Sequence, residues 1–100
     1  ETTAVAIIQQ LVDGVAFLHR YLIAHCDLKP DNIVLSALTG EKVCQWLYII
    51  DFGLARQLNT GDTRIRGFRG NKEWVGPEVT DGASYNPILA DLWPVGKMIK

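Results

Sequence analysis

The sequence has 100 residues, of which 48% are hydrophobic and 21% are charged, and its formal net charge at pH 7 is −1. These values fit one small folded domain and exclude a disordered chain, whose composition would be more polar and more highly charged. The nearly neutral charge provides no field that would attract nucleic acid or an anionic membrane.

The chain also lacks a recognisable membrane or export signal. No apolar run reaches the roughly 18 residues that a membrane-spanning helix needs, and the first residues, ETTAVAII, lack a basic leader. We therefore expect no membrane partner and an intracellular location, cytoplasmic or nuclear. Cys26 and Cys44 lack paired spacing, so a reducing compartment is favoured over a structural disulfide. The oligomeric state stays open.

The first predicted element is a helix from residue 3 to residue 22, where apolar residues recur at intervals of three and four. Gly14 lies inside this helix at a cost of up to about 1 kcal/mol relative to alanine. We therefore expect it to pack closely against a neighbouring element. The predicted buried stripe consists of Val5, Ile8, Leu11, Val12, Val15 and Leu18.

A polar loop and a β-hairpin follow the helix. The loop is HCDLKPDN, from His25 to Asn32, and the predicted hairpin covers residues 32–50 with a turn at LTGE. The second strand ends abruptly at the triplet DFG, residues 51–53. The sequence therefore predicts a strand that delivers an aspartate to a glycine hinge.

The remaining residues are predicted to form a long loop and two helices. Residues 58–73 show neither helical nor strand periodicity. Their arginines are expected to form a solvated face, with contact to an acidic partner or substrate as the alternative; they are Arg64, Arg66 and Arg69. Pro77 is expected to open a short helix. Helical spacing resumes at Ile88, and one side of that helix carries Leu89, Leu92, Val95, Gly96 and Ile99.

Three motifs in this order resemble those of the eukaryotic protein kinase family, of the serine/threonine type. HCDLKPDN is similar to the catalytic loop H-R-D-L-x-x-x-N, DFG is identical to the metal-binding triplet, and GPE at 76–78 is similar to A-P-E. Residues 90–93, ADLW, are also similar to the D-x-W opening of the family's long buried helix. One motif alone would be weak, whereas three in order carry the resemblance.

The resemblance implies an α+β, partial protein-kinase-like fold. Residues 1–100 would be the central part of the catalytic domain, mainly a helical segment of the C-terminal lobe, with a short hairpin carrying the catalytic and metal-binding loops. The implied parts are a helix at 3–22, a catalytic loop at 25–32, a hairpin at 32–50, an activation segment at 51–78 and a buried helix from about 89.

The same resemblance implies transfer of the γ-phosphoryl group of ATP to a protein hydroxyl with Mg²⁺. Asp27 would accept or orient the proton of the hydroxyl, and Lys29 would place its ammonium against the phosphate. Asn32 and Asp51 carry oxygen ligands suited to Mg²⁺. Val34 would lie under the adenine. For each aspartate taken alone, the alternative is a surface charge at a strand or loop end.

Further positions have structural or regulatory roles by resemblance. His25 and Phe52 would stack in an apolar spine, and Asp91 would bond the backbone near His25. Gly53 completes the metal-binding triplet. Glu78 would normally be held by an arginine that this chain lacks.

Cys26 replaces the arginine that, in most kinases, binds a phosphorylated residue of the activation segment. We therefore predict that Thr60 and Thr63 are not switches that act through position 26. A redox or metal role for Cys26 beside His25 is a less favoured alternative, because adjacent residues rarely bind one metal and no second ligand has suitable spacing.

Other departures from the family pattern bear on activity. Asn71 replaces the threonine that normally bonds to the catalytic Asp and Lys, and Gly76 replaces alanine. Pro94 replaces a serine but is tolerable near a first turn. Leu22 stands where a glycine often ends the preceding helix, and a branched residue there does not easily take a positive φ.

The favoured interpretation is therefore an incomplete protein kinase domain that acts on a protein substrate. The alternative is a pseudokinase or truncated fragment that binds or scaffolds, supported by Asn71, by Gly76 and by the absence of a G-x-G phosphate loop. An unrelated α+β binding module would need three ordered motifs by chance. For the isolated chain we expect negligible activity and marginal stability, because its last helix would expose apolar faces.

Overall fold

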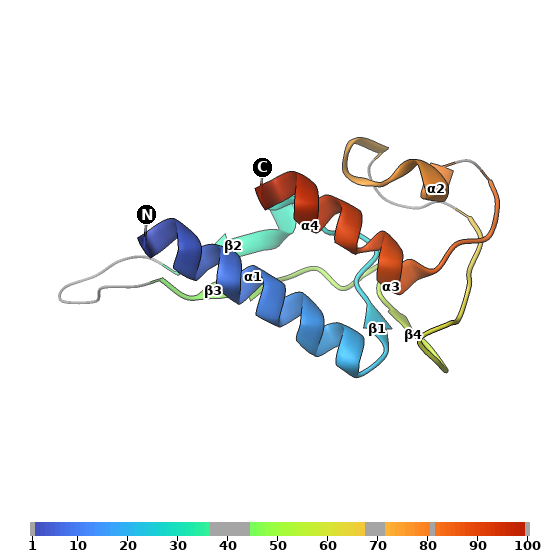
Figure 1. The fold of residues 1–100 in the computed structure, drawn as a ribbon, viewed down its shortest axis with the longest axis horizontal. Coiled ribbons are helices and arrows are strands. Elements are labelled where there is room, and N and C mark those ends of the chain that lie inside the picture. The colour runs from blue at the N-terminus through green and yellow to red at the C-terminus, as the bar shows by residue number, and fades with distance from the viewer. Residues whose placement is uncertain (1, 37–44, 68–71, 81, 100) are drawn as a thin grey trace.

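The computed structural model describes residues 2–36, 45–67, 72–80 and 82–99. It is a mixed structure of helices, two small sheets and two 3₁₀ turns, η1 and η2 (Figure 1). In chain order the elements are α1 (Thr2–Arg20), β1 (Ile23–Ala24), η1 (Pro30–Asn32), β2 (Ile33–Leu35), β3 (Leu47–Ile49), β4 (Arg56–Gln57), η2 (Lys72–Trp74), α2 (Pro77–Thr80), α3 (Pro87–Ala90) and α4 (Leu92–Ile99).

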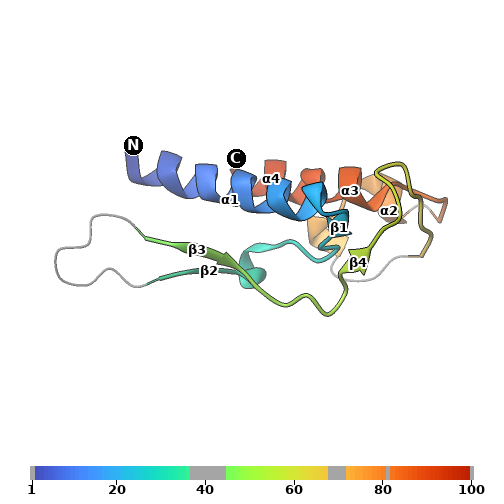
Figure 2. The same ribbon diagram turned by 90° about the horizontal axis from the view of Figure 1, so that it is seen from below.

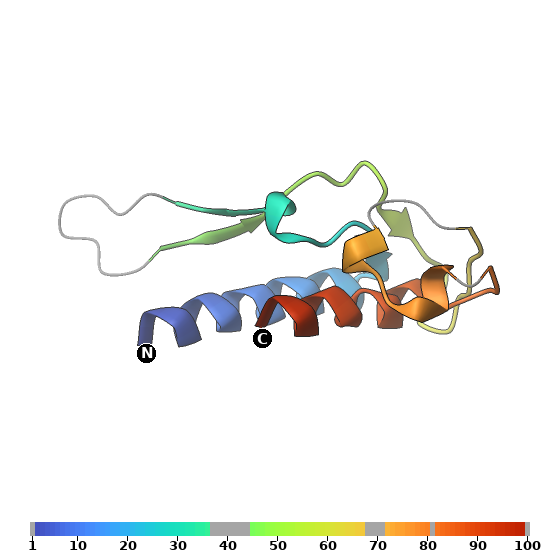
Figure 3. The same cartoon turned by 90° about the horizontal axis from the view of Figure 1, so that it is seen from above.

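The elements form two layers. Helices α1 and α4 lie side by side and run in opposite directions, and the hairpin of β2 and β3 lies to one side of them (Figures 2 and 3). In the hairpin, Val34 pairs with Tyr48 in an antiparallel register. Its turn, predicted at LTGE, lies outside the described residues. The second sheet joins β1 to β4, also antiparallel, with Ala24 opposite Arg56.

The core lies between the two layers. Its buried members come from α1, the loop after β1, and α4, and they are Leu11, Val15, Leu28 and Val95. Partly buried residues of the hairpin and of α4 pack against them. The close contact expected at Gly14 is confirmed, because a Cβ added there would lie 3.1 Å from the Cδ1 atom of Ile49.

The predicted stripe of α1 was only partly right. Leu11 and Val15 are buried, whereas Val5 is 62% exposed and Val12 is 41% exposed. Helical periodicity identifies the apolar residues, but the neighbouring elements decide which of them are covered. The hairpin and α4 cover one part of the stripe and leave these two valines on the surface.

The end of α1 differs from the expectation for Leu22. This residue adopts a φ of 61°, the left-handed conformation that its branched side chain was expected to resist. Two contacts from the β4 region hold it there. The Leu58 N–H donates to the Leu22 carbonyl at 2.7 Å, and the Gln57 amide donates to the Tyr21 carbonyl at 2.8 Å. Tertiary hydrogen bonds therefore stabilise a positive φ that, at the ends of other helices, is usually adopted by a glycine.

The predicted single buried helix at the C-terminal side is two helices. α3 ends at Ala90, α4 begins at Leu92, and Pro94 in the first turn of α4 has no N–H to donate to the Ala90 carbonyl. The apolar side that we predicted is largely exposed, since Leu89 is 60% and Leu92 is 50% exposed. Only Val95 of that side is buried in the core.

The predicted long loop at 58–73 is tied to residues 84–86 over its described part. Ile65 and Tyr85 exchange two backbone hydrogen bonds of 2.8 Å, and the Arg64 guanidinium donates to Ser84. Arg64 is exposed, as predicted, although its guanidinium is also bonded to Ser84. Arg66 is exposed, and Arg69 lies outside the described residues.

Two valines of α1 provide a matched test of this packing. Val15 is 3% exposed and Val12 is 41% exposed. We predict that Val15→Ala lowers the free energy of unfolding by about 2 kcal/mol relative to Val12→Ala, because two buried carbons are removed and the helix propensity changes equally. Urea unfolding measures the difference. Equal midpoints for the two variants would contradict the packing.

Candidate functional site

The carboxylate of Asp91 anchors the polar loop that follows β1. This side chain is 3% exposed and lies between α3 and α4. Its Oδ2 atom accepts from the His25 N–H at 2.8 Å, and its Oδ1 atom accepts from the Cys26 N–H at 3.0 Å. The Nε2 atom of His19, in α1, lies 3.0 Å from Oδ2. One buried carboxylate thus joins two helices to the start of the loop.

Cys26 has a φ of 69°, another left-handed residue without a glycine. Such a backbone persists only where the surroundings fix it. The bond from its N–H to Asp91 is one such constraint. Asp91 therefore also turns the chain so that the next residue, Asp27, leaves the core.

The His25 ring connects this loop to the segment that leads from β3 to Asp51. The ring is fully buried, its Nε2 atom lies 2.9 Å from the Ile50 carbonyl oxygen, and its Nδ1 atom accepts from the Asp27 N–H at 3.1 Å. These contacts fit the neutral tautomer with the proton on Nε2. The Phe52 ring lies 4.9 Å from the His25 ring in an edge arrangement.

Asp27 is held by two neighbours from its own loop. The Asn32 amide donates to the Asp27 carbonyl at 2.8 Å and to its Oδ2 atom at 3.2 Å. The Lys29 ammonium lies 3.9 Å from Oδ1. Because Pro30 opens η1 directly after Lys29, the chain turns back and brings Asn32 to Asp27. The arrangement places a carboxylate beside an ammonium at the surface.

Asn32 is bonded to Ile50, the residue that precedes Asp51. The Ile50 N–H donates to the Asn32 carbonyl at 2.9 Å, which fixes the residue before Asp51 against η1. Asp51 has a φ of 61°, and its Oδ1 atom accepts from the Gly53 N–H at 3.3 Å. An amide oxygen and a carboxylate at this position fit Mg²⁺, which takes few protein ligands and completes its shell with water and phosphate.

The predicted adenine contact lies on the exposed face of the hairpin. Val34 is 42% exposed, and its cross-strand partner Tyr48 is 53% exposed. Their neighbours Ile33 and Ile49 pack against the core, as strand alternation requires. Val34 of β2 and Tyr48 of β3 thus form a largely apolar surface across the hairpin.

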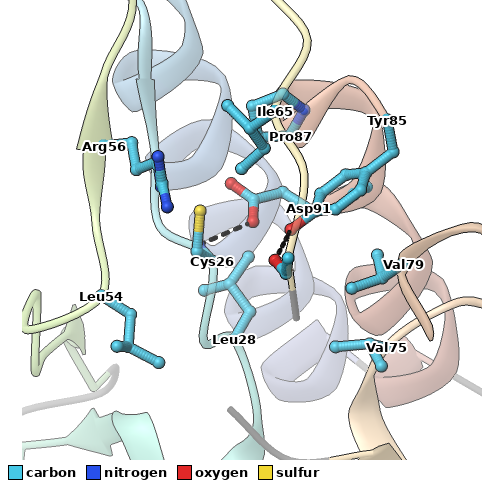
Figure 4. Close-up of a pocket in the computed structure, with 12 residues that line it drawn as sticks. Cys26, Leu28, Leu54, Arg56, Ile65, Val75, Val79, Tyr85, Pro87 and Asp91 are labelled. Atoms are coloured by element: carbon cyan, nitrogen blue, oxygen red, sulfur yellow. Dashed lines mark hydrogen bonds between the residues drawn. The ribbon is translucent and has the colours of Figure 1, made fainter. Parts of the chain in front are cut away.

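Cys26, in the loop of residues 25–32, lines a mostly apolar pocket (Figure 4). Arg56 of β4 lines the same pocket, together with Leu28, Val79 and Tyr85. We did not single out Arg56 from the sequence. Its only distinguishing feature in the sequence is that it is a basic residue three positions after the DFG triplet. Because β4 has only two residues, no periodicity in the sequence could predict that the Arg56 side chain lines this pocket.

Positions 71, 76 and 78 differ in outcome. Asn71 lies outside the described residues, and Glu78 is exposed. Gly76 is buried, and a Cβ there would lie 3.0 Å from Cδ1 of Trp93 and would also contact the Glu78 carboxylate. The Glu78 side chain can move aside, but the indole ring would have to shift. Glycine at 76 therefore fits the position of Trp93.

Among the described residues, no helix is both long and apolar enough to cross a membrane. The same residues contain no group of three or more histidine, cysteine, aspartate or glutamate side chains that could hold a metal. The alternative of a metal site at Cys26 and His25 therefore has no support there. Cys44 lies outside the described residues.

Comparison with known proteins gives a consistent result. The protein kinase domain family matches residues 1–100. Death-associated protein kinase 2 of Homo sapiens is 39% identical over 98 residues, which is 96% of this chain and 25% of that protein. Serine/threonine-protein kinase 17A of Oryctolagus cuniculus is 38% identical over 92 residues, or 90% of this chain and 21% of the relative.

A third relative is named as a kinase subunit. Inhibitor of nuclear factor kappa-B kinase subunit alpha of Danio rerio is 35% identical over 99 residues, which is 99% of this chain and 12% of that protein. The chain thus spans a quarter or less of the length of these curated relatives.

The anchoring role of Asp91 can be tested by Asp91→Asn. The amide group would place N–H donors where an oxygen now accepts, so one of the buried N–H groups at His25, Cys26 or His19 would lose its acceptor. We predict a loss of about 2 kcal/mol in the free energy of unfolding and faster hydrogen exchange at the amides of residues 25 and 26. Asp13→Asn, on the exposed side of α1, is the matched control. The anchor is refuted if both variants behave as the wild type does.

Proposed function

The chain belongs to the protein kinase family, and from this we propose that the protein containing it transfers the γ-phosphoryl group of ATP to a serine or threonine hydroxyl of a protein substrate. The observation that carries the proposal is the position of the Asp27 carboxylate. It is bonded to Asn32, lies 3.9 Å from the Lys29 ammonium, and stands on a loop that Asp91 anchors. The printed name of one relative, serine/threonine-protein kinase 17A, supports the serine/threonine class.

Asp27 would act on the substrate hydroxyl. Phosphoryl transfer needs little covalent help from the protein, so positioning and charge neutralisation dominate. The Asn32 amide bonded to Oδ2 orients the Asp27 carboxylate, which can then align the hydroxyl and accept its proton. Lys29 is close enough to this carboxylate to place its positive charge where negative charge spreads over the transferring group.

Asn32 and Asp51 would hold Mg²⁺. When bound, the ion supplies positive charge that neutralises the phosphate oxygens of ATP. The protein's contribution would be to hold Asn32 and the segment that leads to Asp51 together. The Ile50-to-Asn32 backbone bond and the His25 contact to the Ile50 carbonyl support this arrangement. The Asn32 amide nitrogen is used in bonds to Asp27, so its side-chain oxygen is the group that can bind the ion.

The exposed surface of Val34 and Tyr48 would support the adenine ring. It is apolar, lies on the hairpin that leads into Asp51, and presents side chains away from the core. Tyr48 belongs to β3, which ends shortly before Asp51, so the residues proposed for the base and for Mg²⁺ belong to one part of the chain. Contact between the base and these two side chains would be favourable because it removes apolar surface from water.

A pair of neighbouring aspartates tests the proposed catalytic role. In the natural protein that contains this chain, Asp27→Asn should lower kcat for phosphorylation of a basic protein substrate with Mg²⁺-ATP by at least about a hundredfold, since a general base is removed. Asp31→Asn, four positions later and exposed, should leave kcat within about twofold of the wild type because it lies outside the proposed machinery.

The outcome separates the two interpretations of the sequence. A wild type that is as inert as Asp27→Asn would favour the pseudokinase, which binds or scaffolds. An active Asp27→Asn variant would contradict the assignment of the base.

Cys26 gives a second prediction about regulation. A thiol cannot form the charge-assisted pair that an arginine at this position makes with a phosphate. The Thr63 hydroxyl accepts from the Thr60 N–H at 3.1 Å within an exposed turn. We predict that Thr63→Glu leaves kcat within about twofold of the wild type, measured in the same assay with Thr63→Gln as the uncharged control. Strong activation by Glu, but not by Gln, would show that a switch acts there after all.

A further inference from the structure

The ammonium of Lys97, in α4, lies close to two indole rings. It is 4.6 Å from the centre of the Trp74 ring and 5.4 Å from the centre of the Trp93 ring. It also donates a hydrogen bond to the backbone carbonyl of Glu73. Both ring distances are within the range of cation–π attraction. The position is on the surface, where a lysine ordinarily extends into water.

These contacts join two distant parts of the chain. Trp93 and Lys97 are four residues apart in sequence and therefore lie on one face of α4. Glu73 and Trp74 belong to η2, which comes shortly before the GPE motif. The ammonium thus contacts both a side chain and the backbone of η2, and both contacts depend on its charge.

Gly76 completes the contact from the other side. A Cβ at this position would lie 3.0 Å from Cδ1 of Trp93, closer than almost all real contacts allow. The absence of a side chain lets the backbone after η2 approach the ring whose face Lys97 contacts. Residues 73–76 therefore meet α4 at the Glu73 carbonyl, the Trp74 ring and the backbone of Gly76.

α4 is also the helix that follows the anchor of the catalytic loop. Asp91, which accepts from the backbone of His25 and Cys26, directly precedes Leu92, the first residue of α4. The catalytic loop is bonded to Asp91, and residues 73–76 contact Trp93 and Lys97 of α4. The loop and residues 73–76 are therefore both attached to the same stretch of helix. A change in the hold of Lys97 would alter the position of residues 73–76 relative to Asp27.

We propose that Lys97 is a positioning residue that fixes residues 73–76 on α4 and thereby sets their place relative to the catalytic loop. Its effect on phosphorylation rests on the proposed function, whereas its effect on the order of residues 73–76 does not. The device depends on a positive charge, so arginine should replace lysine and an apolar side chain of similar length should not.

The test uses three variants of the natural protein that contains this chain. Lys97→Met keeps the length and removes the charge, and Lys97→Arg keeps the charge. Lys72→Met is the matched control, because Lys72 is an exposed lysine in η2 itself. The first readout is hydrogen exchange at the amides of residues 73–76, and the second is kcat and KM for a protein substrate with Mg²⁺-ATP.

We expect Lys97→Met to raise the exchange rates of residues 73–76 by about tenfold and to lower kcat/KM by about tenfold, as loss of a cation between two rings implies. Lys97→Arg and Lys72→Met should stay within about twofold of the wild type in both readouts. In a Trp74→Leu background, Lys97→Met should change both readouts less than it does in the wild type, because one of the partners of the charge is already gone while Trp93 and the Glu73 carbonyl remain.

Three results would overturn the proposal. Unchanged exchange in Lys97→Met would show that the charge does not order residues 73–76. Faster exchange with unchanged kcat/KM would reduce Lys97 to a structural contact. Failure of Lys97→Arg to restore exchange would exclude the cation as the cause. If the wild type phosphorylates nothing, the proposed function fails, while the exchange rates still support or overturn the ordering role of Lys97.

Discussion

The site depends on one buried carboxylate, that of Asp91. Burying a charge is costly unless hydrogen bonds replace the lost water. Here the backbone N–H groups of His25 and Cys26, together with the His19 ring, provide that replacement. The same bonds hold Cys26 in a left-handed conformation that it would not adopt unaided. The loop thus provides hydrogen-bond donors for the buried carboxylate, and the carboxylate in turn fixes the backbone conformation of the loop.

Order passes from this anchor to the residues proposed to act on substrate. His25 connects Asp91 to the Ile50 carbonyl, and Ile50 in turn bonds to the backbone of Asn32. Asn32 then holds the Asp27 carboxylate. Because each link is a hydrogen bond of fixed direction, the loop and the end of β3 behave as one preorganised unit. α4 begins directly after Asp91 and also carries Lys97. Residues 73–76, which contact Lys97, are therefore attached to the same helix as the loop that Asp91 anchors.

The sequence predicted the parts of the site that local motifs encode. The loop around Asp27 and Asn32, the triplet at Asp51 and the contact of Asp91 with the backbone near His25 could be expected because short ordered motifs carry them. The close packing at Gly14 was also predictable, since a glycine inside a helix has a cost that needs a reason. The roles of these residues in catalysis remain proposals.

What the sequence missed depends on long-range contacts. The stripe of α1 included Val5 and Val12, which no neighbouring element covers in the described structure, because periodicity does not reveal where the neighbours end. Leu22 takes a positive φ because β4 supplies hydrogen bonds, and that two-residue strand has no pattern of its own. From the sequence, Lys97 would be expected to be solvated, because its contact with Trp74 forms only in the folded chain.

The most direct test of the account is a structure of the natural protein with Mg²⁺ and a non-hydrolysable ATP analogue. We predict metal bound by Asn32 and Asp51, with Asp91 still bonded to residues 25 and 26. Nucleotide bound without contact to Asn32 and Asp51, or a loop that has lost its bonds to Asp91, would contradict it.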